Sequence, residues 1–236
     1  MPIARDFQLE FDEQVYIDLH GERFTRMLER PGTRAQFDEA LESIRQLADP
    51  AACWDTFPIE KFLHEKIQLR NGLWLGGGPV VAVMGGSEEL IVAVCTLGPR
   101  VDEGIRRFHQ QGELFKMIVL DELASWAIDQ VREQLCTRFE EEAARRGWRA
   151  SAPLSPGESA WPVTDQVAIF TLLDTEPIGV TLNESCLMYP IKSLSLAMGI
   201  GPGPLGVEGA STCDFCTLRE RCHYRRIRPG VTPASA

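Results

Sequence analysis

The sequence predicts an α+β domain, in which antiparallel strands lie beside long helices. Two short runs rich in β-branched residues, at 79–84 and 89–97, are joined by a glycine turn, which is typical of an antiparallel hairpin. Apolar side chains recur at helical spacing over residues 113–146, which predicts one long helix. A chain of 236 residues is long enough to bury a substantial core around these elements.

Residues 1–60 are predicted to be a helical N-terminal part. Thr33 is expected to cap a helix whose apolar residues recur up to Leu47, and Asp49-Pro50 is expected to end it. A turn-rich stretch follows, in which residues 76–78 are all glycine. Because the Lys-Ser/Thr pair of a nucleotide-phosphate loop is missing there, we expect the glycines to form a hairpin turn.

The core of the domain is expected to extend over residues 61–203. Pro99 is expected to begin a helix, which Gly112 separates from the long helix, and Gly147 is expected to end the long helix as its C′ residue. Cys95 is expected to be buried within the sheet as a small hydrophobic residue. The remaining expected elements are a Pro/Ser/Gly-rich loop over 148–163, a helix over 164–173, and strands over 178–182 and 187–198.

Composition narrows the classes of function. The formal net charge is −10, which argues against a non-specific nucleic-acid binder, because phosphate contacts need a basic face. The sequence shows no signal-peptide pattern and no run of about 18 apolar residues, so we expect a cytoplasmic protein without a membrane span. The seven cysteines are therefore expected to be thiols or metal ligands rather than disulfides.

Residues 204–236 are predicted to form a cysteine-rich tail. Within it, Cys213, Cys216 and Cys222 are spaced so that their thiolates can converge on one soft metal centre. The spacing leaves open both a zinc site and an iron–sulfur cluster, and it leaves open the fourth ligand. From Cys213 to Arg228 the tail carries five arginines against two acidic residues, which fits a solvated face or a docking patch for an acidic partner.

Several segments of the chain, taken in order, resemble one known family. They are Cys95-Thr-Leu-Gly-Pro99, the opening of the long helix from Gly112 to Trp126, Leu154-Ser-Pro-Gly157, Ile178-Gly-Val-Thr-Leu-Asn-Glu-Ser185 and Met188-Tyr-Pro-Ile-Lys-Ser193. Together with the cysteine tail, they resemble the reactivation domain of cobalamin-dependent methionine synthase, in its stand-alone form. The resemblance covers about residues 60–228.

This resemblance implies a twisted, mainly antiparallel sheet with long helices. It also implies a domain that binds S-adenosylmethionine and docks on a corrinoid protein or methionine synthase, whose inactive Co(II) cobalamin is then reduced and remethylated. For the cysteine tail, the resemblance favours an iron–sulfur cluster of the 4Fe–4S type over zinc, since a stand-alone activator needs an electron path. A flavodoxin or a ferredoxin would then be the electron donor.

The resemblance further implies which residues form the site. Glu184 and Ser185 are implied for the catalytic role, because this stretch faces the cofactor cleft in the family. The residues implied for contacts to the cofactor or to the corrin edge are Arg149, Ser155, Pro156, Gly157, Lys192 and Ser193. The loop departs from the family pattern at Pro153 and Glu158, which stand near the usual arginine and tyrosine positions. S-adenosylmethionine binding therefore stays open.

Three hypotheses follow from these observations. The first is a redox activase, in which an iron–sulfur centre delivers an electron to the cobalamin of a partner protein. The second is a non-catalytic adaptor that binds a corrinoid protein and has a zinc-stapled tail. The third is a methyltransferase-like activase that uses S-adenosylmethionine despite the altered loop.

Overall fold

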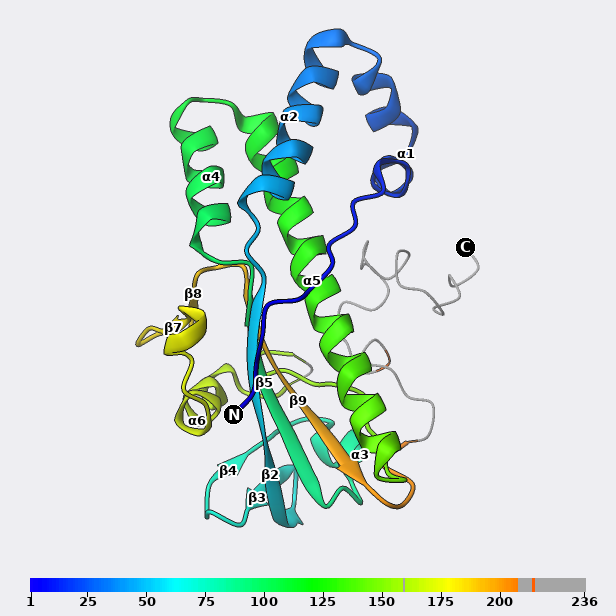
Figure 1. The fold of residues 1–236 in the computed structure, drawn as a ribbon, viewed down its shortest axis with the longest axis vertical. Helices are drawn as coiled ribbons and strands as arrows, with labels where there is room; N and C mark the ends of the chain where they lie inside the picture. The colour runs from blue at the N-terminus through cyan, green and yellow to red at the C-terminus, as the bar shows by residue number, and fades with distance from the viewer. Residues whose placement is uncertain (159, 208–213, 215–236) are drawn as a thin grey trace.

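A computed structural model describes residues 1–158, 160–207 and 214 of the chain. They form the α+β fold that the sequence predicts, with long helices against a mainly antiparallel sheet (Figure 1). The strand order is β4-β3-β2-β5-β9-β6, and β1 pairs with β2 off this path. The strands are β1 (Ile3–Ala4), β2 (Ala51–Leu63), β3 (Lys66–Leu69), β4 (Trp74–Leu75), β5 (Glu89–Thr96), β6 (Arg149–Ala150) and β9 (Ser193–Gly201).

A second, two-stranded sheet and the helices complete the fold. The small sheet is a hairpin of β7 (Thr181–Leu182) and β8 (Met188–Tyr189). The α-helices are α1 (Glu13–Leu28), α2 (Pro31–Leu47), α3 (Val80–Met84), α4 (Pro99–Gln110), α5 (Leu114–Arg145) and α6 (Gln166–Leu172). Short 3-10 helices cover Val163–Asp165 and Glu176–Ile178.

β5 is the central strand of the large sheet. It pairs with β2 on one side and with β9 on the other, and its last seven residues are all buried. Because side chains alternate along a strand, β5 contributes to two separate cores. The side chains that face α5 are Ile91, Ala93 and Cys95, and those that face the opposite core are Leu90, Val92 and Val94. The predicted burial of Cys95 is therefore confirmed.

α5 lies over one face of the sheet, and α2 and α4 pack against it (Figure 1). Lys116 is buried at this junction, where its Nζ lies 2.9 Å from Glu39 Oε2 of α2 and 2.6 Å from Glu113 Oε2. Gly112 and Gly147 flank the helix with φ values of 73° and 70°, a left-handed conformation that glycine adopts without strain. Both predicted boundaries of the long helix are thereby confirmed.

The N-terminal segment, residues 5–12, lies in an extended conformation along α5 (Figure 1). Two glutamine side chains of α5 hold it by reciprocal hydrogen bonds. The Gln134 amide accepts from the Gln8 backbone N–H over 3.1 Å and donates to the Gln8 carbonyl over 2.7 Å. Gln130 does the same with Glu10, over 2.9 and 2.8 Å. The four-residue spacing of the glutamines along the helix thus matches the two-residue spacing along the strand-like segment.

The structure corrects the predicted hairpin. Residues 79–84 were predicted to be a strand, but Val80–Met84 is the short helix α3, and the partners of β5 are β2 and β9. A short apolar run looks the same to periodicity in a buried helix and in a buried strand. The glycines at 76–78 connect β4 to α3 instead of forming a hairpin turn. In addition, residues 51–60 were predicted as part of a helical region, and they belong to β2.

The predicted strand over 187–198 is also interrupted. β8 ends at Tyr189, the Tyr189–Pro190 peptide bond is cis, and β9 begins only at Ser193. Proline has no N–H for a ladder hydrogen bond, so the break falls where the sheet would otherwise continue. We call residues 189–193 the 189–193 turn.

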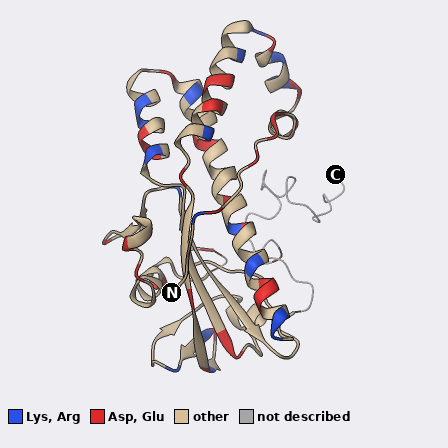
Figure 2. Ribbon diagram, in the orientation of Figure 1, with Lys and Arg blue, Asp and Glu red and all other residues tan. Residues whose placement is uncertain are grey.

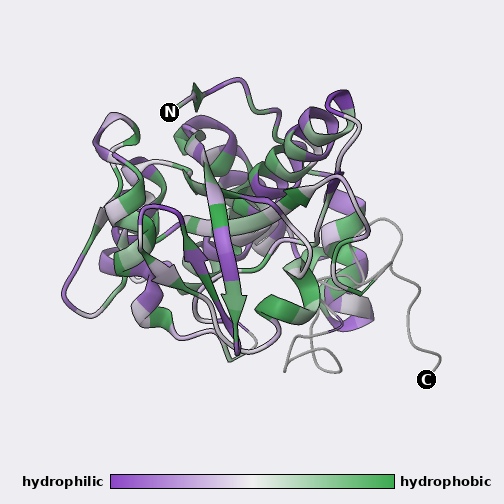
Figure 3. Cartoon of the chain, turned by 90° about the horizontal axis from the view of Figure 1, so that it is seen from below, coloured by the Kyte–Doolittle hydropathy of each residue, from purple (hydrophilic) through white to green (hydrophobic). Residues whose placement is uncertain are grey.

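Surface chemistry follows the layers of the fold. Figure 2 shows acidic and basic residues mixed along the helices, whereas the strands of the large sheet carry few charges. Figure 3 shows hydrophobic and hydrophilic residues side by side around the helices, as expected for half-buried elements. No helix in the described part of the chain is long and apolar enough to cross a membrane.

Candidate functional site

The 189–193 turn is fixed to the end of β5 by a chain of hydroxyl contacts. Ser193 Oγ donates to the Pro190 carbonyl over 2.7 Å and lies 2.9 Å from Thr96 Oγ1. Thr96 Oγ1 in turn accepts from the Gly98 N–H over 3.0 Å. Ser193 and Thr96 are both buried, and their hydrogen bonds are satisfied here by each other and by the backbone. The predicted site residue Ser193 therefore lies inside the fold rather than on its surface.

Lys192 connects the same turn to α5. Its Nζ lies 2.8 Å from Asp121 Oδ1, donates to the Asp121 carbonyl over 3.1 Å and donates to Ser125 Oγ over 3.0 Å. The side chain is only 11% exposed, so the ammonium exchanges most of its hydration for these contacts. The structure thus places Lys192 as a brace between the turn and the long helix.

Helix α4 braces the turn from the other side. Asp102 is buried in the first turn of α4, and its Oδ2 accepts from the Ile191 N–H over 2.6 Å. Arg106, one helical turn later, donates from Nη2 to the Tyr189 hydroxyl over 3.1 Å. Held in this way, the turn, β8 and the residue just before β8 present three apolar side chains to solvent. They are Leu187, Tyr189 and Ile191, which are 60%, 48% and 67% exposed.

Glu184 and Ser185 lie at the tip of the β7–β8 hairpin. They lie between the two strands predicted over 178–182 and 187–198, and they occupy a turn with exposed side chains. Asn183 Oδ1 organises this turn by accepting from the backbone N–H groups of Ser185, over 3.0 Å, and of Leu187, over 2.9 Å. An Asx arrangement of this kind fixes the backbone and leaves the carboxylate of Glu184 at the surface.

The 149–163 loop runs along the edge of β9. Arg149 belongs to β6, is exposed and pairs with Gly201 at the end of β9. Further on, Leu154 forms an isolated bridge with Ala197. Arg149 and Lys192 are therefore at opposite ends of β9, about 30 Å apart by the rise of a strand. The predicted cofactor residues are thus distributed along one strand instead of meeting at one point.

The tip of this loop is compact. Ser155 and Pro156 are buried, and Gly157 is exposed with φ 95°, a conformation that favours glycine. The Gly157 N–H donates to the Trp161 carbonyl over 2.8 Å, which closes the loop on itself. Two acceptor atoms, Glu158 Oε2 in the loop and Gln166 Oε1 at the start of α6, are buried and have no hydrogen-bond partner among the described residues. Such acceptors would be satisfied by a ligand that donates hydrogen bonds or carries positive charge.

Asp165 fastens the loop to the rest of the domain. Its Oδ2 accepts from Trp161 Nε1 over 2.8 Å and from the Gly76 N–H over 2.7 Å. The neighbouring Gly77 has no room for a side chain, because a Cβ there would lie 2.6 Å from Pro162 Cδ. The glycine triplet is thus explained by close packing of the loop, rather than by phosphate binding or a hairpin.

The cysteines fall into two groups. Cys213, Cys216 and Cys222 lie outside the residues that the structure describes. Among the described residues, no three His, Cys, Asp or Glu side chains come together in a way that could hold a metal. Burial raises the pKa of three described thiols, to about 11 for Cys53 and Cys136 and to about 12 for Cys95. These thiols are protonated at neutral pH and are poor ligands.

Sequence reasoning missed the residues that brace the site. Asp102, Asp121 and Asp165 each accept hydrogen bonds that fix the 189–193 turn or the loop tip. Asp102 carried a usable local signal, because an acidic residue in the first turn of a helix favours interaction with the helix dipole. The contacts of Asp121 with Lys192 and of Asp165 with Gly76 join residues distant in sequence, so no local pattern could have identified them.

Comparison with known proteins identifies the fold by its similarity to solved structures. No protein-family model matches the sequence, and no curated protein shows significant similarity. The fold is similar to a solved structure described as "Crystal Structure of the MetH Reactivation Domain bound to AdoHcy", with a TM-score of 0.58 and 18% identity. The match covers 86% of this chain and 76% of that one. This similarity establishes the fold of the chain.

Proposed function

We propose that this protein reactivates a corrinoid protein by promoting the reduction of its cobalamin from Co(II) to Co(I). The observation that carries the proposal is the shared fold with the MetH reactivation domain, which extends over 86% of the chain. The sequence resemblance supports the same function, because the Met188–Ser193 stretch that carries it forms the braced 189–193 turn. In this role the partner would be methionine synthase or another corrinoid methyltransferase.

The exposed apolar side chains near the 189–193 turn support a docking role. Leu187, Tyr189 and Ile191 lie within five residues of one another, and hydrogen bonds from α4 fix the turn that carries two of them. Rigid, exposed apolar groups of this kind are typical of contact surfaces, since little ordering entropy is lost on binding. We infer that they contact the corrinoid protein.

The electron path in this proposal runs through the cysteine tail. Thiolates are the ligands that iron–sulfur clusters require, and Cys213, Cys216 and Cys222 supply three of them within ten residues. Burial raises the pKa of the Cys53, Cys95 and Cys136 thiols, so the tail is a better donor set than these three. A bound cluster would supply one electron to Co(II), and a reduced flavodoxin or ferredoxin would supply that electron to the protein.

The metal and redox parts of the proposal are tested together. The full chain is purified without oxygen, its iron and zinc are measured, and EPR spectra are recorded. A corrinoid protein in the Co(II) state is then mixed with reduced ferredoxin, with and without the chain. We expect iron, and faster formation of Co(I), both of which are lost when the three tail cysteines are changed to alanine. A zinc-loaded protein that binds the corrinoid protein without changing its cobalt would assign the adaptor function instead.

The docking surface has its own test. The variant Ile191→Ser is compared with Val167→Ser, because Val167 on α6 is also exposed, at 55%, and belongs to another part of the surface. Loss of a central apolar contact is expected to weaken binding of the corrinoid protein by about tenfold in the first variant and little in the second. Equal affinities for the two variants would place the contact surface elsewhere.

A second candidate function adds S-adenosylmethionine as the methyl donor. The buried acceptors Glu158 Oε2 and Gln166 Oε1 favour this second candidate. Glu158 belongs to the loop that the resemblance implies for cofactor binding, and a ligand with a positive sulfonium and ammonium would satisfy both acceptors. In this reaction the electron pair of Co(I) forms a bond to the methyl carbon, and the carbon–sulfur bond breaks to release S-adenosylhomocysteine. The cobalt is then methylated Co(III).

Calorimetry tests this candidate directly. The full chain is titrated with S-adenosylmethionine and, separately, with S-adenosylhomocysteine, and heat of binding is expected with both. The variant Glu158→Gln is expected to lower the affinity for the cationic S-adenosylmethionine at least about tenfold. S-adenosylhomocysteine lacks the sulfonium charge, so its affinity is expected to change less. An absence of binding heat with both ligands would remove the methyl-transfer step from the proposal.

A further inference from the structure

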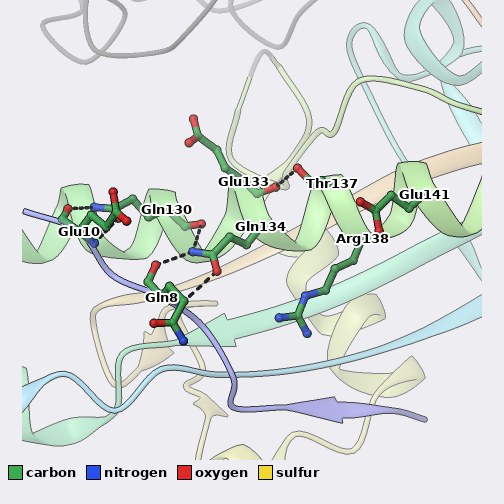
Figure 4. Close-up of a pocket in the computed structure, with 8 residues that line it drawn as sticks. All are labelled: Gln8, Glu10, Gln130, Glu133, Gln134, Thr137, Arg138 and Glu141. Carbon is green, nitrogen blue, oxygen red and sulfur yellow. Dashed lines mark hydrogen bonds between the residues drawn. The ribbon is translucent and has the colours of Figure 1, made fainter.

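A groove opens along α5 beside the N-terminal segment (Figure 4). It encloses about 480 Å³. The residues that line it are Gln8, Glu10, Gln130, Glu133, Gln134, Thr137, Arg138 and Glu141. We call it the α5 groove. Its two walls belong to different parts of the chain, which the reciprocal glutamine bonds hold together.

The charges of the α5 groove are unbalanced. Glu10, Glu133 and Glu141 are exposed carboxylates, whereas the groove's lining contains a single cationic side chain, Arg138. Arg138 already pairs with Asp6, with Nη1 2.9 Å from Oδ1, and this contact lowers the pKa of the Asp6 carboxyl. The lining thus holds more carboxylates than cations, which gives the groove a net negative potential that favours a cationic partner.

The α5 groove is also preformed. Four hydrogen bonds fix residues 8–10 against the helix, and the Arg138 guanidinium lies 4.9 Å from the Phe7 ring centroid. An extended peptide could lie in this groove without first ordering its walls, which removes one of the main costs of binding. The groove thus has the shape and charge of a site for an extended basic segment.

The chain itself contains one such segment. We propose that the α5 groove binds the arginine-rich part of the protein's own C-terminal tail, residues 219–228. This stretch holds five arginines and one acidic residue, Glu220, although the whole chain carries a net charge of −10. Guanidinium groups match carboxylates with two parallel hydrogen bonds, so arginine suits an acidic groove better than lysine does.

The connection to the tail is long enough for this contact. The last described residues before the tail are anchored on α3, because the Gly206 N–H donates to the Gly85 carbonyl and the Val207 N–H donates to the Ala82 carbonyl. α3 and α5 pack on opposite faces of the sheet, so two layer spacings of about 10 Å each separate them. Eleven residues lie between Val207 and Arg219, and such a stretch spans up to about 40 Å.

A tail that belongs to the same chain has a further advantage. Tethering gives it an effective concentration in the millimolar range, so weak ion pairs suffice to keep it bound at low ionic strength. Because the cysteines at 213–222 directly precede and overlap the arginine-rich stretch, binding in the groove would hold them beside α5. The contact itself depends on charge, and it does not depend on the metal or on any activity towards cobalamin.

Carbodiimide cross-linking of the full chain tests the proposal. Residues 208–236 contain no lysine, so the wild-type tail cannot form such cross-links through a side-chain amine. In the variant Arg225→Lys/Arg226→Lys, we expect the introduced lysines to couple to Glu133, Glu141 or Glu10, within the monomer. Adding Glu133→Gln and Glu141→Gln should reduce the cross-link yield at least about tenfold, as should salt near 0.5 M, which screens ion pairs.

The matched control is Glu103→Gln. Glu103 is an exposed carboxylate on α4, away from the groove, so its removal should leave the cross-link yield unchanged. Cross-links that map mainly to other carboxylates, or that appear only in dimers and grow with protein concentration, would overturn the proposal. A functional failure in cobalt reduction would leave this result unaffected, because the readout is a covalent bond between two peptides.

Hydrogen exchange provides a second measurement on an otherwise native protein. In Arg225→Glu/Arg226→Glu, repulsion between the tail and the groove should expose the N-terminal segment. We expect the backbone amides of Gln8 and Glu10 to exchange about tenfold faster than in the wild type, which corresponds to about 1.4 kcal/mol of lost protection. Exchange rates at these amides that are equal in the two proteins would contradict binding of the tail here.

Discussion

Replacement of Lys192 by methionine should destabilise the fold by removing the brace between the 189–193 turn and α5. The ammonium contacts the Asp121 carboxylate, the Asp121 carbonyl and Ser125 Oγ at 2.8–3.1 Å, and it is largely buried. Hydrogen bonds to a charged group contribute about 1.5–3 kcal/mol each. Asp121 is half exposed and regains water in the variant, so we expect a net loss of about 2–3 kcal/mol in the free energy of unfolding.

Urea denaturation at neutral pH measures this loss. With a slope of about 2 kcal/mol per molar urea, the midpoint should fall by about 1 M while the slope stays unchanged. The matched control is Lys66→Met, because Lys66 is an exposed lysine in β3, and its replacement should change the stability by less than about 0.5 kcal/mol. A Lys192→Met protein as stable as the control would refute the bracing role and would favour a lysine kept for contact with a ligand.

Three further outcomes are expected from the described contacts. Asp165→Ala should cost about 2–3 kcal/mol, because it leaves Trp161 Nε1 and the Gly76 N–H without their acceptor, and the quenching of Trp161 fluorescence by acrylamide should increase. Iodoacetamide at pH 7.5 should modify Cys186 faster than the buried thiols of Cys53 and Cys95, as peptide mass spectrometry of the native protein can measure; equal rates would contradict the burial of these two. The thiols of Cys53, Cys95 and Cys136 have pKa values raised above 9.0 in the folded protein, so their stabilising contribution is complete below pH 9 and is lost as the pH rises toward 11. Denaturant titrations between pH 8.5 and 10 should show a decline of up to about 1.4 kcal/mol per thiol and pH unit, which replacement of the buried cysteines by alanine makes shallower.

The helical half of the fold was readable from local sequence signals. Asp49-Pro50 marks the end of α2, and Gly112 and Gly147 mark the two ends of α5. Each signal acts through the backbone of its own position, by removing an N–H or by adopting a positive φ. Local chemistry of this kind does not depend on what the segment packs against.

The strand pairing was harder to predict, because it depends on distant partners. β2 contains Pro58, which argues against a central strand in sequence, yet Pro58 stands at the last pair of the β2–β5 ladder. Beyond that point β2 leaves β5 and continues beside β3, with a register shift between Ile59 and Lys61. β2 takes the position beside β5 that the predicted strand at 79–84 would have occupied, and that apolar run forms the helix α3.

The candidate site was predicted in its segments but not in its geometry. The stretch from Met188 to Ser193 is one of the segments that carry the resemblance, and the structure gives it a cis peptide bond and braces from two helices. The roles of Lys192 and Ser193 as internal contacts could not be read from sequence, since Lys192 and Asp121 are 71 residues apart. Glu184 is exposed because it lies in the turn at the tip of the β7–β8 hairpin, between the two predicted strands.

The position of β5 has a consequence for how the protein is made. During synthesis the strand leaves the ribosome about a hundred residues before β9, so one of its edges waits without a partner while the nascent chain grows. That strand is also among the most apolar parts of the sequence, and such an edge attracts other growing chains. We therefore expect the yield of native protein in a cell to depend on chaperones that shield the half-finished sheet until residue 201 has emerged.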